Sequence, residues 1–176
     1  MIDKNNGVRR YQYIVFILWL IFTVIAAKYF IFGRLVAFDP SNKLDQDSIA
    51  IVNNIKTDLS LQNARLNNTI IHFTSQGCSC ASYSAPHKES INRQARQSDF
   101  TIKEIELSVK NRNIIPSTPA ILILGNKGEL VYLGPYGEGI ECSIESSIVD
   151  IILKNYIKGF NANLIINKAK GCYCHL

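Results

Sequence analysis

The 176-residue sequence has few charged residues, few prolines and no repeated segment. Charged residues make up 19% against 47% hydrophobic ones, with only five prolines and ten glycines. This composition excludes a disordered tail, a collagen and a coiled coil. The sequence also lacks a Ser/His/Asp grouping, a phosphate-binding glycine loop and the C-x-x-C-H motif of covalent haem. We therefore expect one modest folded domain.

Basic charge is too sparse for a nucleic-acid surface. The formal net charge is +5, from 19 Lys and Arg against 14 Asp and Glu. Five of these cations and two of the acids lie in the first 40 residues, which leaves 14 basic and 12 acidic side chains, a balance of +2, from Ser41 onward. Binding to phosphates needs clustered Lys and Arg on one face. Nucleic acid is thereby excluded as a partner.

An apolar stretch near the start decides the expected compartment. Ile14 to Ala27 is apolar apart from Thr23, and the hydrophobic character continues to Phe38. A bilayer requires about 20 such residues. Arg9 and Arg10 precede the stretch, so the positive-inside rule keeps the N-terminus in the cytoplasm. We predict a cytoplasmic segment 1–10, a transmembrane segment 11–38, a linker 39–47 and a periplasmic domain 48–176, held as a single-pass protein in a bacterial inner membrane.

The same stretch has a second interpretation, a cleaved signal peptide. Val24, Ile25 and Ala26 resemble the small-residue pattern of a cleavage site. A cleaved precursor does not need hydrophobicity that continues for a dozen residues beyond Ala27. An uncleaved signal anchor is therefore favoured.

The 136 residues from Ser41 to Leu176 predict an α/β fold, a small mixed sheet flanked by helices. Apolar periodicity, β-prone runs and turn residues set the expected elements. In order, these are a helix capped by Ser48, a buried strand 69–73, a helix 81–96 containing Pro86, strands 100–107 and 120–124, a hairpin turn 125–128, a returning strand 129–133, and a helix of about 143–158 that Gly159 ends.

Five cysteines lie in the predicted periplasmic part, where thiols tend to form disulfides. Four of them form two C-x-C pairs, Cys78/Cys80 and Cys172/Cys174, and Cys142 stands alone. Cys78 follows a strand pattern and opens a helix, whose N-terminus stabilises a thiolate. We expect Cys78 to be the more exposed attacking thiol. A bridge from Cys78 to Cys80 would need a non-helical loop and would be easily reduced, and the alternative is a purely structural disulfide.

Several motifs resemble the thioredoxin-like family. Phe73-x4-Cys78 with Pro86 eight residues later is similar to its strand, nucleophilic cysteine and helix-kinking proline, and Thr118-Pro119 before a strand and a glycine-rich hairpin resembles its cis-proline loop. The match covers about residues 68–158. The terminal C-x-C and the glycine-rich segment before Cys142 also resemble membrane-anchored bacterial proteins of this class. The resemblance implies that Thr118 and Pro119 contact substrate and that the Thr118–Pro119 bond is cis.

The position of the second cysteine departs from the family pattern. In the family this cysteine would fall at Ala81, whereas this chain has Cys80 one residue earlier. Cys80 is the first choice as the resolving thiol, followed by a terminal cysteine or Cys142. We further expect a structural bridge from Cys142 to Cys172 or Cys174, after residues 164–166 fold back as a short strand.

These features predict a thiol-disulfide oxidoreductase that uses Cys78 and Cys80, needs no cofactor and reacts with thiol or disulfide proteins. One alternative is a copper- or zinc-handling chaperone, because two C-x-C pairs and His175 offer soft ligands. The other is a non-catalytic binding module stapled by disulfides. His72 lies inside a strand and is expected to be a hydrogen-bonded core residue, whereas His87 is expected to be exposed.

Overall fold

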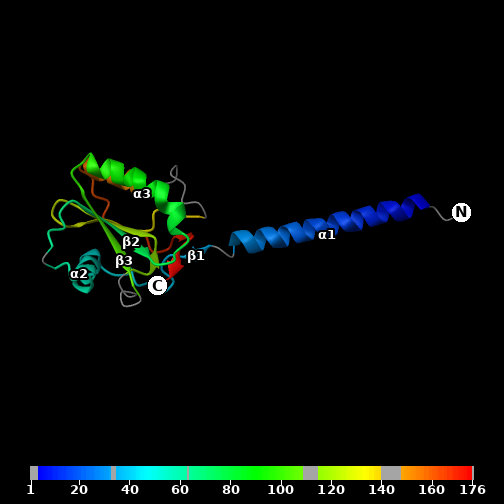
Figure 1. Ribbon diagram of the computed structural model, residues 1–176, viewed down its shortest axis with the longest axis horizontal. Coiled ribbons are helices and arrows are strands. Elements are labelled where there is room, and N and C mark those ends of the chain that lie inside the picture. The colour runs from blue at the N-terminus through cyan, green and yellow to red at the C-terminus, as the bar shows by residue number, and fades with distance from the viewer. Residues whose placement is uncertain (1–3, 33–34, 63, 109–114, 140–147, 176) are drawn as a thin grey trace. The chain divides into compact units, whose positions relative to one another are not determined.

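The structure is a computed structural model that describes residues 4–32, 35–62, 64–108, 115–139 and 148–175 (Figure 1). The chain divides into two compact units, Met1–Arg34 and Leu35–Leu176.

The first unit contains the predicted apolar helix, α1, which runs from Lys4 to Phe32. Its stretch Arg10–Phe30 is 21 residues long and apolar enough to cross a membrane. At 1.5 Å per residue this stretch spans about 31 Å, close to the thickness of a hydrocarbon core. The helix is confirmed, but it ends earlier than the predicted boundary at residue 38.

The second unit begins at Leu35 and so includes residues 39–47, the segment that the sequence suggested as a linker. Strand β1, Val36–Ala37, pairs with a strand near the C-terminus. Phe38 is fully buried in the core, and the buried Asp39 carboxylate accepts the backbone N–H of Leu44 at 2.7 Å. An apolar residue and a turn-forming acid hold this segment on the domain, where its polar composition had suggested a free connection.

A five-stranded mixed sheet forms the centre of the second unit, in the order β3-β2-β5-β6-β7. Strand β2 pairs in parallel with β3 and antiparallel with β5, β5 pairs antiparallel with β6, and β6 pairs in parallel with β7. The bounds are Thr69–Ser75 for β2, Thr101–Leu107 for β3, Ala120–Leu124 for β5, Leu130–Gly134 for β6 and Leu164–Ile165 for β7. The predicted mixed sheet is confirmed, including the short returning strand at 164.

Helices cover both faces of this sheet. In Figure 1, α3 lies above it and α2 below it. Successive strand residues point to opposite faces, so Ile70 packs with Ile91 of α3, whereas Ile71 packs in the cluster that contains Ile55 of α2. Helix α4 shares the α3 face through Leu153. The bounds are Ser48–Asp58 for α2, Ala81–Arg96 for α3 and Ile148–Ile157 for α4.

Local signals place most helix ends and turns correctly. Helix α2 is capped by Asp47, one residue before the predicted Ser48, because the Asp47 carboxylate accepts two helix N–H groups. Gly128, with φ of 71°, closes the predicted hairpin, and Gly159, with φ of 94°, follows α4 as predicted. The first predicted turn of that last helix, 143–147, lies outside the described residues.

Two short strand pairs tie the C-terminal segment to the rest of the unit. Strand β8, Lys170–Gly171, pairs antiparallel with β1. Strand β9, Cys174–His175, pairs antiparallel with β4, Ser117–Thr118. Neither pairing could be predicted from the sequence, because a two-residue strand is too short to show a periodic pattern. They bring the terminal cysteines toward the turn that precedes α3.

Candidate functional site

The first C-x-C pair lies in the turn between β2 and α3. Gly77 has φ of 73°, which L side chains rarely adopt, and lets the chain turn after the strand. The Cys78 N–H donates to the Ser75 carbonyl at 3.3 Å. Cys80 occupies the N-cap position of α3. Cys78 therefore stands just before the helix, where sequence reasoning had placed the helix start.

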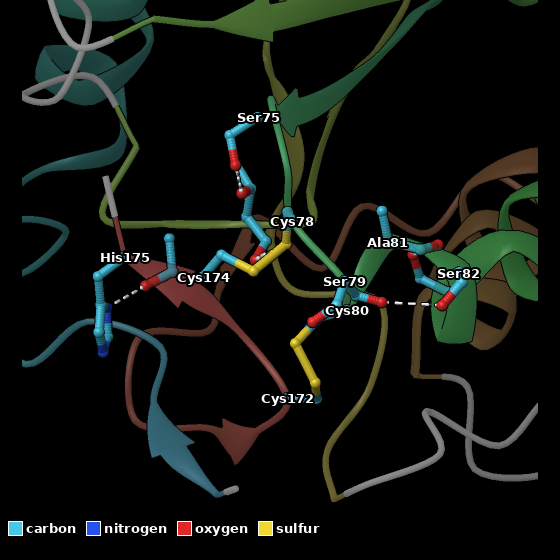
Figure 2. Close-up of a disulfide and its surroundings, with 12 residues drawn as sticks. Ser75, Cys78, Ser79, Cys80, Ala81, Ser82, Cys172, Cys174 and His175 are labelled. Carbon is cyan, nitrogen blue, oxygen red and sulfur yellow. Dashed lines mark hydrogen bonds between the residues drawn. A yellow bond between two sulfur atoms is a disulfide. The ribbon is translucent and has the colours of Figure 1, made fainter.

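Two disulfides join this turn to the C-terminal segment (Figure 2). Cys78 is bonded to Cys174 with a Cα–Cα distance of 5.8 Å, and Cys80 is bonded to Cys172 with a Cα–Cα distance of 5.5 Å. The expected Cys78–Cys80 bridge is thus not the bond present. The expected bridge from Cys142 to a terminal cysteine is wrong, because both terminal cysteines are already bonded, and Cys142 itself lies outside the described residues.

Backbone pairing explains why the sulfur atoms meet. The register of β9 on β4 sets Cys174 opposite Thr118. Thr118 is followed by Pro119 in a cis peptide bond, and the Thr118 carbonyl oxygen lies 3.6 Å from Cys78 Sγ. The Thr118 hydroxyl also shares a 2.6 Å hydrogen bond with the Ser75 hydroxyl at the end of β2. The predicted cis bond beside Cys78 is confirmed.

Tyr173 anchors the C-terminal pair from the opposite side. In an extended chain, alternate side chains point the same way, so Cys172 and Cys174 share one side and Tyr173 faces the other. Its side chain is buried, its ring packs edge-on against Phe38 at 5.2 Å between centroids, and its hydroxyl donates to the Gly137 carbonyl at 2.7 Å. The C-x-C spacing thus presents two thiols on one side of a fixed strand.

The four cysteines differ in exposure. Cys80 is only 6% exposed, whereas Cys78, Cys172 and Cys174 are half-buried. The expectation that Cys80 is less exposed than Cys78 is confirmed. The Sγ atoms of Cys78, Cys80 and Cys174 all lie within 4.8 Å of one another. The two disulfides are therefore neighbours, and a thiolate released from one lies close to the other.

His72 is a hydrogen-bonded core residue, as predicted. Its side chain is fully buried, with Nε2 2.7 Å from the Asn92 amide oxygen and Nδ1 hydrogen-bonded to the Tyr136 hydroxyl. Burial is the main cause that lowers the pKa of His72 below its ordinary value, and burial also raises the pKa of Tyr136. These groups hold β2 against α3 and do not reach the cysteines through any described contact.

The other two histidines differ from their expectations. His87 was expected to be exposed but is fully buried, with Nε2 3.5 Å from the Asp150 carboxylate of α4. The sequence hid this, because polar residues surround His87 in the chain. His175 is exposed, and its Nδ1 donates to the Ser117 hydroxyl at 2.8 Å, while that hydroxyl donates to the Phe38 carbonyl. Within the described residues, the His175 side chain therefore bonds to Ser117.

Sequence reasoning did not find Tyr173, Ser75 and Ser117 as parts of this site. The signal that could have suggested that the two C-x-C pairs bond to each other is their identical spacing, since two segments with equally spaced thiols can join twice. Nothing comparable marks Ser75 and Ser117, whose contacts depend on tertiary packing.

The fold and site together define a disulfide-bearing mixed α/β domain whose C-terminal strand is bonded to the turn before α3. A family described as a domain of unknown function, DUF6436, matches residues 49–176, and the chain belongs to that family. The match includes all four of these disulfide-bonded cysteines. No match to the chain was found among curated proteins or among solved structures.

Proposed function

We propose that this protein is a membrane-anchored thiol-disulfide oxidoreductase with a thioredoxin-like domain on the periplasmic side of a bacterial inner membrane. The observation that carries the proposal is the environment of Cys78. Its sulfur stands between the end of a buried strand and the start of α3, 3.6 Å from the carbonyl that precedes cis-Pro119, and it is already bonded to another cysteine.

Three further features support the thioredoxin-like assignment. The chain runs from β2 through a cysteine-containing turn into α3, which contains Pro86. The cis-proline is followed by the antiparallel hairpin of β5 and β6. Helix α4 follows the hairpin and packs on the same face of the sheet as α3. This is the order that the sequence resemblance implies.

The proposed reaction is a two-electron exchange. One thiolate of a partner dithiol attacks Cys78 Sγ, the Cys78–Cys174 bond breaks, and Cys174 leaves as a thiolate. The second partner thiolate then attacks the partner sulfur bonded to Cys78, which forms the partner's disulfide and releases the Cys78 thiolate. The partner loses two electrons and two protons, and the Cys78/Cys174 pair gains them. The same steps in reverse reduce a partner's disulfide.

Cys174 takes the resolving role that the sequence had suggested first for Cys80. Strand β9 holds Cys174 opposite Thr118, so its sulfur returns to Cys78 with little movement of the backbone. Cys80 is engaged with Cys172 and is almost fully buried. Thr118 and Pro119 form the edge along which the partner's extended chain lies beside Cys78.

A trapping experiment on the full-length protein in detergent tests these roles. In Cys174→Ser, the free Cys78 thiolate attacks a peptide disulfide, and the mixed disulfide persists because no resolving thiol remains. We expect this adduct on non-reducing electrophoresis, with its mass located on Cys78. Cys78→Ser should form none, and Cys142→Ser, the same chemical change at the fifth cysteine, should turn over like the unchanged protein.

Two results would count against the proposal. If Cys80→Ser traps the peptide and Cys174→Ser does not, Cys80 is the resolving thiol. If neither traps it and the oxidised protein does not oxidise a dithiol peptide, the two disulfides are structural, and the chain acts as a stapled binding module.

The membrane orientation needs a separate test. Helix α1 is long and apolar enough to cross a bilayer, and Arg9 and Arg10 precede its apolar stretch. After reduction of intact cells, a membrane-impermeant maleimide should label Cys78 in membrane-bound protein that retains Met1. Soluble protein that begins near Ala27 would refute the anchor, and labelling only after lysis would refute the orientation.

A further inference from the structure

We propose that reduction of both disulfides turns the same four cysteines into a binding site for one thiophilic metal ion, Zn²⁺. This goes beyond disulfide exchange, because it assigns a second, ligand-binding state to the reduced domain. It needs only that the disulfides can be reduced, so it does not depend on the proposed enzymatic activity.

The distances between the sulfur atoms suit one shared ion. Four thiolates around Zn²⁺ at about 2.3 Å stand about 3.8 Å from one another in a tetrahedron. The Sγ atoms of Cys78, Cys80 and Cys174 already lie within 4.8 Å of one another. The sulfurs of each bonded pair, Cys78 with Cys174 and Cys80 with Cys172, have to move apart to about this tetrahedral spacing once their disulfide is broken. Side-chain rotation alone can supply such a shift.

The C-terminal segment that carries Cys172 and Cys174 is held by contacts that do not involve sulfur. Strand β8 stays paired with β1, and the Cys172 N–H donates to the Gly139 carbonyl at 3.1 Å. Tyr173 remains buried against Phe38 with its hydroxyl on Gly137. The terminal thiols therefore remain beside the β2–α3 turn after reduction, as a site for a metal ion requires.

The chemistry of the ligands favours a soft ion over a hard one. All four donors are thiols, and thiolates bind Zn²⁺ and Cu⁺ in preference to Mg²⁺ or Ca²⁺. The N-terminal end of α3, where Cys80 occupies the N-cap position, stabilises negative charge on the adjacent thiolates. A tetrathiolate set matches the closed, four-coordinate sites of structural zinc.

The conversion balances as two coupled steps. Two molecules of a dithiol reductant give four electrons and four protons to the two disulfides and become disulfides themselves. The four thiols then bind Zn²⁺ and release four protons. Reoxidation of the four thiolates by two disulfides removes four electrons and expels the ion. Metal binding and the oxidised state therefore exclude each other.

Zinc retention by the full-length protein in detergent tests the proposal. The protein is reduced with a phosphine, mixed with excess Zn²⁺, desalted and analysed by atomic emission. We expect one Zn²⁺ per reduced chain, none per oxidised chain, and protection of four thiols from alkylation. Co²⁺ should give the absorption of a tetrahedral thiolate complex. Cys142→Ser should keep the ion, whereas Cys172→Ser, which retains the Cys78/Cys174 pair, should lose it.

The comparison of reduced with oxidised protein requires no substitution, so a misfolded variant cannot obscure it. Equal zinc contents in the two states would overturn the proposal, and so would zinc retention by Cys172→Ser. The trapping assay is run without metal. Reduced protein that binds Zn²⁺ but forms no mixed disulfide would refute the oxidoreductase and leave the metal site standing, and the converse result would do the opposite.

Discussion

The two disulfides span nearly the same number of residues but lie in different surroundings. Cys78–Cys174 joins residues 96 positions apart, and Cys80–Cys172 joins residues 92 positions apart. Both partners of the first are half-buried, and Cys174 belongs to the two-residue strand β9. In the second, Cys80 is buried at the start of α3. Under the proposed function, the first disulfide undergoes exchange and the second holds the two segments together.

The presence of two disulfides between the same segments means that one can open while the other keeps the C-terminal segment in place. Either disulfide alone closes the long chain loop, which is worth about 4.7 kcal/mol on the chain-entropy relation for about 100 residues. Once one is formed, the other closes only a ring of about six residues, worth about 2 kcal/mol on the same relation. The domain therefore loses little when one bond opens, provided that the other remains.

The largest expected effect is from removing both bonds. In Cys172→Ser/Cys174→Ser, the remaining pair, Cys78 and Cys80, cannot close the long loop. The free energy of unfolding should fall by about 6 to 7 kcal/mol, which is comparable with the total stability of many domains. Urea unfolding followed by circular dichroism measures it. A loss below about 2 kcal/mol would mean that strand pairing and Tyr173 already fix the segment without sulfur.

The second prediction removes the support that both bonds share. Tyr173→Ala deletes a buried ring and the hydrogen bond to Gly137, and should lower the free energy of unfolding by about 3 to 5 kcal/mol with both disulfides intact. Phe160→Ala is the matched control, because Phe160 is 70% exposed and should change stability by less than about 0.5 kcal/mol. Equal effects of the two substitutions would remove Tyr173 from the anchor.

The third prediction compares the bonds one at a time. Cys174→Ser and Cys172→Ser each leave one long-range bond, so each should lower the free energy of unfolding by about 2 kcal/mol. The sum of the two single effects should be smaller than the effect of the double substitution. Urea unfolding at matched detergent concentration gives all three values. Additive losses would show that the two disulfides do not share a loop.

The smallest expected effect is a difference in the rates at which the two disulfides are reduced. Because Cys78 and Cys174 are both half-buried whereas Cys80 is buried, limiting phosphine should open Cys78–Cys174 several-fold faster than Cys80–Cys172. Acid quenching, alkylation and peptide mass spectrometry follow both bonds in one sample. Equal rates would remove the distinction between exchange and holding roles, and earlier opening of Cys80–Cys172 would reverse it.

Local patterns predict much of the fold. The β-prone run 69–73, the Gly125–Gly128 turn and Gly159 each act through neighbours in the chain, so the sequence reveals them. Residues 39–47 resemble a linker in sequence because the packing that holds them on the domain, Phe38 against the distant Tyr173 and Leu44 in the core, leaves no local pattern.

The site was only half predictable for the same reason. Cys78 and the cis bond before Pro119 follow from short motifs, and the structure brings them together. The partners of Cys78 and Cys80 depend on the register of β9 on β4, which two residues define and no periodicity announces. The equal spacing of the two C-x-C pairs could suggest that they bond to each other, but it could not decide which cysteine bonds to which.

The long separation between the bonded cysteines also has a consequence in time. Cys174 follows Cys78 by 96 residues, and a ribosome adding 5 to 20 residues per second needs about 5 to 20 s to synthesise that interval. During synthesis, the first C-x-C pair therefore exists before its final partners. If the chain is exported as it is made, Cys78 and Cys80 meet the oxidising machinery of the cell as a lone dithiol. A transient bond formed then has to be exchanged for the two bonds of the finished domain.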